Sequence, residues 1–275
     1  MRLTLPALAL VLLVTAPACE GEGAKTALSY TEDAKRAYDN AMKEYNAHNW
    51  IEAQTMLREV KRKYSYSKYA RLAELRIADA DMEQEKFADA IREYKDFVHA
   101  HRSDVELTTY ARAKIAEATY AEIPESLLLP AAEERDQADV VDAYKELRSF
   151  LSDYPSAKES PRMRELLGAV TARLMKHELY VARFYLGKSN YEAAVARIRY
   201  ALHNYGESDV GPLVAASEAS ELRAEALLLL GTTYLQMHKW TEARAAFQAV
   251  VSDYGQSPVA VQARNYLDYL STRGV

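Results

Sequence analysis

Residues 227–254, LLLLGTTYLQMHKWTEARAAFQAVVSDY, decide the fold of this chain. Their apolar positions recur at the three- and four-residue spacing of two amphipathic helices, separated by a polar turn that ends at Trp240. Gly231 lies nine residues before this tryptophan, and Ala243 and Phe247 lie three and seven residues after it. Two antiparallel helices approach closely only where small side chains meet at the crossing, and bulky side chains then fill the flanks. The stretch therefore predicts a tight helical hairpin.

The same spacing occurs at four earlier places in the chain. At each place an alanine follows the reference position by three residues, and the pairs are Trp50 and Ala53, Phe87 and Ala90, Val140 and Ala143, and Tyr191 and Ala194. This is the pattern of the tetratricopeptide repeat, whose helical hairpins stack side by side. A final amphipathic segment, residues 258–270, would cover the last apolar face. The sequence therefore predicts an all-α fold: a tetratricopeptide-repeat solenoid of five helix pairs plus a C-terminal capping helix.

The reference positions lie further apart than the ~34 residues of the usual repeat, so longer helices or insertions are expected. Pro124 and Pro130 disallow a continuous helix across residues 122–137. We expect an inserted loop there, which separates the two helices of the third repeat and docks on that repeat. Long helical patterns follow at residues 161–186 and 191–205, and residues 206–217 are expected to form a second loop.

Composition and charge exclude several classes of protein. The chain has 275 residues, with 9 glycines and 8 prolines, which is little turn material for an all-β fold. Its net charge of −5 comes from interspersed positive and negative residues, without the basic stripe that nucleic-acid binding requires. No nucleic-acid partner is expected.

The N-terminal residues have the features of an export signal. Residues 1–18 combine one basic residue, a short apolar run and the small residues Ala16-Pro17-Ala18, which is typical of a secretory signal peptide. Cleavage there would make Cys19, the one cysteine in the chain, the first mature residue. A bacterial lipoprotein at the periplasmic face of the outer membrane is the favoured interpretation. A soluble periplasmic protein is the alternative.

The predicted domains follow from this start. Residues 19–30 hold the lipidated cysteine and a polar tether, and helical pattern begins near Thr31. Residues 31–104 form the first two repeats and carry a groove for a substrate segment. Residues 105–275 form repeats three to five with the capping helix, and they dock on a partner.

Tyrosines crowd the turn YSYSKYA between the first two repeats. An exposed tyrosine offers a large apolar face and a hydroxyl at small entropic cost, so such residues suit the capture of an extended peptide. Tyr64, Tyr66, Tyr69 and Tyr110 are predicted to line the substrate-segment groove. The alternative for each tyrosine is packing between repeats.

Motifs for catalysis or metal binding are incomplete. His177-Glu178 begins an H-E-x-x-H pattern, but Val181 stands where the second histidine is needed. The acidic positions at residues 79, 81, 83 and 85 alternate as in a calcium loop but lack its glycine, so a solvated helix face is expected. The chain is therefore predicted not to be an enzyme, and no metal ion or cofactor is expected.

Several stretches resemble the BamD family of outer membrane assembly lipoproteins. They are YSYSKYARLAELRIADADME, FADAIREYKDFVHAH, RDQADVVDAYKELRSFLSDYPSAKES and KHELYVARFYLGKSNYEAAVARIRYALHNYG. They occur in the family's order over residues 30–270, and the run at residues 177–197 is the most specific. Departures are Ser65 and Arg102 in place of prolines and Asp81-Met82 in place of an aromatic pair. These departures fall in the predicted groove.

The resemblance implies a set of partners. Repeats three to five would dock on a BamA-type barrel-forming subunit with other assembly lipoproteins, and the first two would receive segments of unfolded outer-membrane β-barrel proteins. Arg197 matches the family arginine that pairs with an acidic residue of BamA, with Tyr191 and Tyr205 beside it as partner-binding residues. From the residues alone, Arg197 is a solvated charge. The alternative function is a periplasmic adaptor lipoprotein that serves peptidoglycan or polysaccharide machinery.

Overall fold

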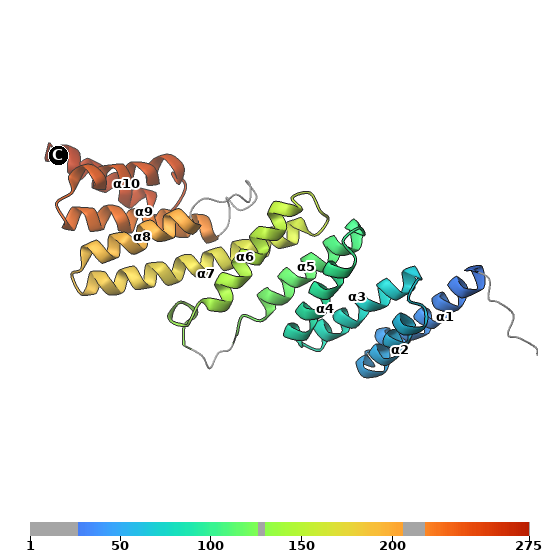
Figure 1. Ribbon diagram of the computed structural model, residues 1–275. Helices are drawn as coiled ribbons and strands as arrows, with labels where there is room; N and C mark the ends of the chain where they lie inside the picture. The colour runs from blue at the N-terminus through green and yellow to red at the C-terminus, as the bar shows by residue number, and fades with distance from the viewer. Residues whose placement is uncertain (1–26, 126–129, 206–217, 275) are drawn as a thin grey trace, which may run out of the picture.

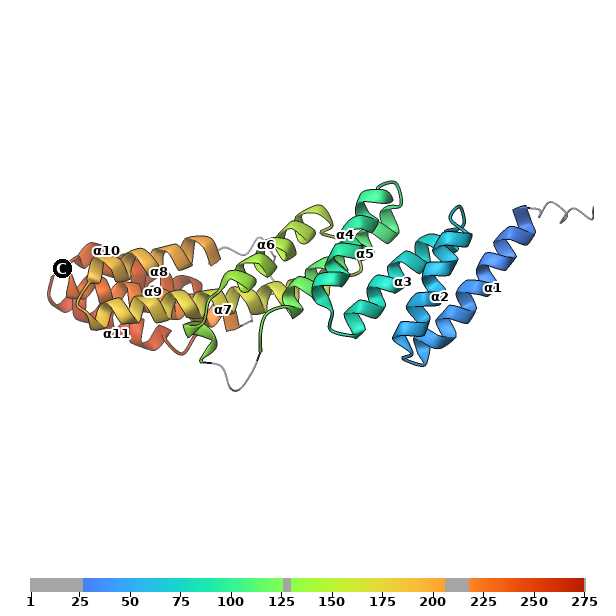
Figure 2. The same cartoon turned by 60° about the horizontal axis from the view of Figure 1, so that its bottom comes forward.

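The computed structural model describes residues 27–125, 130–205 and 218–274, and within these ranges every regular element is helical. The elements are α1 (Ala27–Asn46), α2 (Trp50–Lys63), α3 (Lys68–Glu83), α4 (Phe87–Ala100), α5 (Val105–Ala121), the 3-10 helix η1 (Ala132–Glu134), α6 (Ala138–Asp153), α7 (Ser160–Gly187), α8 (Tyr191–Tyr205), α9 (Glu218–Gln236), α10 (Trp240–Asp253) and α11 (Ala260–Thr272). Figures 1 and 2 show one elongated row of antiparallel hairpins, with α1 at one end and α10 and α11 at the other.

The five predicted helix pairs are present, and α11 covers the last of them, so the predicted fold class is confirmed. The five alanines that defined the pattern are all fully buried: Ala53, Ala90, Ala143, Ala194 and Ala243. The predicted signal peptide, Cys19 and the loop at residues 206–217 lie outside the described residues.

Gly231 shows why the fifth hairpin needs a glycine. A Cβ atom added there would lie 2.5 Å from the ring of Phe247. The glycine therefore makes room for the phenylalanine ring, and Ala243 is not among the nearest contacts. Phe247 stacks in turn on Tyr266 of α11, with ring centroids 4.8 Å apart. The close crossing therefore also holds the capping helix.

Four hairpins turn in the same way. His48, Glu85, Ser189 and His238 each have a positive φ, and each lies two residues before the first residue of the second helix. The next backbone N–H donates to a carbonyl five residues earlier, as from Asn49 to Glu44 at 3.0 Å and from Lys86 to Asp81 at 2.9 Å. This is a helix C-terminal motif that usually places glycine in the left-handed region. The third hairpin lacks it because the insertion replaces the turn.

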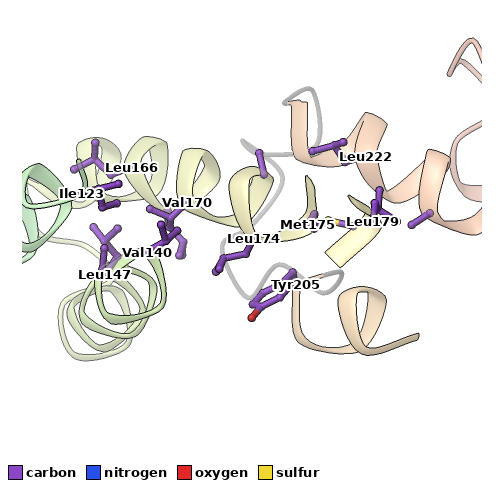
Figure 3. Packing of buried hydrophobic residues seen from close by; sticks show 14 of the residues in the cluster. Ile123, Val140, Leu147, Leu166, Val170, Leu174, Met175, Leu179, Tyr205 and Leu222 are labelled. Carbon is purple, nitrogen blue, oxygen red and sulfur yellow. The ribbon is translucent and has the colours of Figure 1, made fainter. Parts of the chain in front are cut away.

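The insertion docks on α7, the first helix of the fourth repeat, and not on the third repeat as predicted. A ring nitrogen of His177 lies 2.8 Å from the carbonyl oxygen of Glu133, and Arg173 pairs with Glu125 at 3.2 Å. Figure 3 shows Ile123 beside Leu166 of α7. Residues 126–129 lie outside the described residues.

The apolar core is unequally divided along the row. Its largest cluster runs from α5 to α10, and Figure 3 shows α7 supplying Leu166, Val170, Leu174, Met175 and Leu179 between α6 and α9. The clusters around α1 to α3 and α3 to α5 are smaller. At 28 residues, α7 is long enough to contact α6, α8 and α9, and its length accounts for the wide spacing between the reference positions of the third and fourth repeats.

Candidate partner-binding surfaces

A buried carboxylate lies at the centre of the N-terminal repeats. Asp79 of α3 is only 5% exposed, so the predicted solvated acidic face is wrong at this position. Its carboxylate accepts hydrogen bonds from the hydroxyls of Tyr94 (2.5 Å) and Tyr110 (2.8 Å), and it also pairs with Arg76. Asp79 therefore ties α3 to α4 and α5.

The two tyrosines that donate to Asp79 stay protonated because they are buried beside its negative charge. Burial, followed by the negative charge of Asp79, raises the pKa of both Tyr94 and Tyr110 above the ordinary value. The same two causes raise the pKa of Tyr45 to about 12. These hydroxyls remain hydrogen-bond donors at neutral pH, and the hydroxyl of Tyr110 donates inward to Asp79.

A second buried carboxylate joins the first two repeats. Asp81 of α3 is also buried, again against the prediction, and accepts a hydrogen bond from Gln54 of α2 at 2.8 Å. The same amide nitrogen of Gln54 lies 3.1 Å from the carbonyl oxygen of Ile77. One signal in the sequence points to this burial, because Asp79 and Asp81 flank Ala80 within the apolar pattern of α3.

The structure separates the tyrosines that were predicted to share a groove. Tyr64 is buried edge-on against Tyr30, with ring centroids 5.4 Å apart, and Tyr69 is half-buried against Tyr38 at 5.7 Å. Tyr66, at the tip of the α2–α3 turn, is 95% exposed. The contact of Tyr30 with Tyr64 shows that α1 already packs on the first repeat ahead of the predicted helix start near Thr31.

Arg197 lies on the outer side of α8 beside a buried carboxylate. Its guanidinium is 3.3 Å from a carboxylate oxygen of Glu178 on α7, and the side chains are 45% and 9% exposed. The pairing fixes one side of the guanidinium and leaves the other side accessible. Tyr191 is half-buried at the start of the same helix, close in sequence to Arg197.

Tyr205 lies inside the repeat rather than on its surface. Its ring contacts Tyr144 of α6 edge-on, with centroids 5.5 Å apart, and also approaches Tyr200 at 6.0 Å. Burial, followed by a hydrogen bond with Tyr200, raises the pKa of Tyr205. Tyr205 therefore packs the end of α8 against α6.

An exposed aromatic pair on α7, Tyr180 and Phe184, was not predicted from the sequence. Arg173, His177, Tyr180 and Phe184 share one helix face by their spacing. The inserted segment covers the first two of these residues, whereas Tyr180 and Phe184 remain exposed. Two aromatics four residues apart, continuing the line of His177, were the available signal.

Two clefts open between the second and third repeats, on the side of the insertion. The smaller, of about 450 Å³, is lined by residues of α4, α5 and α6, among them Lys95, Thr119 and Asp142, and by Glu122 directly after α5. The larger, of about 670 Å³, lies between residues 85–89 and 121–125. Among the described residues, no three side chains of histidine, cysteine, aspartate or glutamate are grouped so that they could hold a metal ion. No described helix is long and apolar enough to cross a membrane.

The stacked hairpins make this chain a tetratricopeptide-repeat protein, and a family model of that repeat matches residues 225–257. A second family model, YfiO, described as outer membrane lipoprotein, matches residues 31–233. This match covers most of the chain, and the chain therefore belongs to this family of outer membrane lipoproteins.

Three solved repeat structures are also similar to the chain. A thermophilic tetratricopeptide-repeat protein of Thermus thermophilus is 14% identical, covers 87% of this chain and 99% of its own, and gives a TM-score of 0.36. The TPR2AB domain of yeast Sti1 in complex with pHSP90 is 15% identical over 87% and 97%, with a TM-score of 0.40. A tetratricopeptide-repeat protein from Parabacteroides merdae is 12% identical over 87% and 99%, with a TM-score of 0.26.

Proposed function

We propose that this protein is a non-catalytic scaffold of the BamD type in a β-barrel assembly complex. It docks on a BamA-type subunit and presents unfolded outer-membrane proteins to that subunit for folding and insertion. The observation that carries the proposal is the match of an outer membrane lipoprotein family to residues 31–233, which span the helical repeats. A row of stacked hairpins supports such a role because it offers an extended surface to other polypeptides.

In this proposal the docking half is centred on Arg197. A planar guanidinium suits carboxylate recognition, because two parallel N–H groups can donate to two oxygens. Glu178 already holds one side of Arg197, which reduces the side-chain entropy lost when an acidic residue of BamA binds the other side. Tyr191 contributes at the start of the same helix, and the buried Tyr205 keeps α8 in place.

The N-terminal repeats receive the substrate segment. The accessible edges of Tyr69 and Tyr110 supply contacts for its apolar side chains, and Tyr64 supports the turn from inside. Tyr66, which is 95% exposed at the tip of the α2–α3 turn, is left out of this groove. Asp81 is buried with a hydrogen bond at a position where the family carries an aromatic residue, so this groove has less aromatic surface and more hydrogen bonding beneath it.

Anchoring is proposed to come from Cys19. Substituting Cys19→Ala should release the protein from washed envelopes into the soluble fraction, because stable attachment requires acyl chains. The wash is made at high ionic strength so that only hydrophobic attachment is measured. Retention of the variant in the membrane fraction at wild-type level would contradict the proposed anchor.

Docking is tested by co-purification from detergent-solubilised envelopes. Arg197→Glu should remove most of the BamA-type subunit that co-purifies with the tagged protein, because like charges then face each other across the interface. The matched control is Arg199→Glu, which makes the same charge change at an exposed position two residues further along α8. Equal recovery of the subunit with both variants would overturn the proposed docking site.

A further inference from the structure

The α2–α3 turn concentrates positive charge in a chain that is acidic as a whole. Residues 58–71 contain six lysines or arginines and one glutamate, whereas the whole chain has a net charge of −5. The exposed members at the turn, together with one aromatic, define what we call the basic corner: Arg62, Lys63, Tyr66 and Lys68.

The cations of the basic corner direct their charge outward. Within the described ranges, Arg62, Lys63 and Lys68 form no ion pair with a carboxylate, although neighbouring Lys61 pairs with Glu74 at 3.4 Å. The amino groups of Lys63 and Lys68 lie over the rings of Tyr64 and Tyr69, at 5.7 and 5.3 Å from their centroids. These two tyrosines thus hold two cations in place without neutralising them.

Tyr66 adds an apolar contact among these charges. It is 95% exposed, while the other two tyrosines of the turn pack against α1. An uncovered aromatic ring with a polar tip, flanked by long basic side chains, is the combination that binds at the interface between lipid headgroups and acyl chains.

The basic corner lies where the chain enters the repeats. Tyr30, in the first turns of α1, contacts Tyr64, and Figures 1 and 2 both show the start of α1 and the α2–α3 turn along the same edge of the row. Cys19 precedes Ala27 by eight residues, which can span at most about 29 Å. A lipid-anchored chain therefore keeps this corner within reach of the membrane that anchors it.

We propose that the basic corner binds the phosphate headgroups of an anionic lipid surface, as a second membrane contact beside the acyl anchor. The role of the anchor rests on the function proposed above, whereas the lipid contact is carried by the charge, exposure and position of the corner. An acyl anchor alone leaves the protein free to tilt. Two contacts at one end fix the direction in which the row of repeats extends from the membrane.

The proposal is tested with the mature chain carrying Cys19→Ala, so that no acyl chain contributes. Its binding to vesicles that contain phosphatidylglycerol is compared with binding to vesicles of phosphatidylcholine alone. We expect binding to the anionic vesicles only, with loss at high salt because the charges are exposed. The triple variant Arg62→Glu, Lys63→Glu, Lys68→Glu should bind roughly a hundredfold more weakly, at about 1 kcal/mol per basic residue near an anionic surface.

The matched control reverses three exposed cations elsewhere: Lys188, Lys239 and Arg273. It should bind like the parent chain, and a glutamine version of the corner variant keeps the comparison valid if charge reversal disturbs folding. Tyr66→Ala should weaken binding severalfold, and Tyr66→Trp should retain it. Equal binding of the corner and control variants would overturn the proposal.

A different polyanion at the corner is a separate outcome. If the parent chain binds a single-stranded RNA oligonucleotide or inorganic phosphate through the corner but does not bind anionic vesicles at the same phosphate concentration and ionic strength, the corner is not a lipid site and the proposal fails. Failure of this test leaves the co-purification and anchoring experiments unaffected, because neither is measured on vesicles.

Discussion

The two halves of the molecule are held together by different kinds of contact. From α1 to α5 the apolar clusters are small, and the helices are joined through buried carboxylates, with Asp79 linking α3, α4 and α5. From α6 onward one large apolar cluster around α7 predominates. Because each repeat contacts mainly its neighbours, stability is a sum of local terms. The same repeat framework can therefore be stabilised by a polar interior or by an apolar one.

The largest expected effect tests the polar interior. Asp79→Ala would leave the hydroxyls of Tyr94 and Tyr110 and the charge of Arg76 without their shared acceptor, at a cost of about 3 kcal/mol in the free energy of unfolding. Chemical denaturation measures the loss, and hydrogen exchange should locate it in α3 to α5. Asp89→Ala, at a more exposed ion pair on α4, should cost less than ~0.5 kcal/mol. If the two variants unfold alike, the polar network does not stabilise the N-terminal half.

The second prediction concerns the apolar half. Gly231→Ala would place a methyl group 2.5 Å from the ring of Phe247, and overpacking of this kind costs about 1–3 kcal/mol. Thermal unfolding should show the decrease, together with earlier exchange of amides in α11. The control is Gly187→Ala, where an added methyl meets nothing within 4 Å and should be neutral or stabilising by up to ~1 kcal/mol. A neutral Gly231→Ala would show that α9 and α10 can separate freely.

The third prediction should give the same result in both halves, because the left-handed turn occurs in each. Glu85→Gly and His238→Gly remove a strained non-glycine residue at positive φ and should each stabilise the protein by roughly 0.5–1 kcal/mol. The measurement is the denaturant midpoint. Lys95→Gly, at an exposed position within α4, should instead destabilise by about 1 kcal/mol. Destabilisation by both turn variants would show that the side chains make contacts that outweigh the strain.

The smallest expected effect is the alkaline pH dependence of the N-terminal half. The pKa of Tyr45 is raised from 10.0 to about 12 in the folded chain, so between these values the folded state retains a proton that the unfolded state loses. Stability from this group is complete below pH 10.0 and decreases as the pH rises toward about 12. Denaturation as a function of pH should show a shallower decrease for Tyr45→Phe, and an unchanged slope would contradict the assignment.

The sequence predicted the parts of the structure that depend on local spacing. The five alanines, the helix at residues 191–205 and the capping helix follow from helical periodicity, in which residues three and four positions apart share a face. The polar interior could not be predicted in this way. Asp79 meets Tyr94 and Tyr110 across 15 and 31 residues of sequence, and Asp81 meets Gln54 across 27. Such partners depend on how the helices pack within a repeat and between neighbouring repeats.

The candidate surfaces were less predictable than the fold for the same reason. Tyr64 and Tyr66 are two residues apart in one turn, yet one is buried against Tyr30 and the other is almost wholly exposed. Arg197 has an intramolecular partner, Glu178, that lies 19 residues away on another helix. A pattern of residue types indicates which side chains could bind a partner. The packing of adjacent helices decides which of them remain accessible.

The docked insertion has a consequence for the size of the contact area that α7 can offer. The segment covers α7 as far as His177, and the rings of Tyr180 and Phe184, one and two turns further along the helix, remain exposed. Removing the contacts that Glu125 and Glu133 make would uncover the helix from Arg173 onward. The contacts of one connecting segment thus set how much apolar surface α7 exposes, without any change to the repeats themselves.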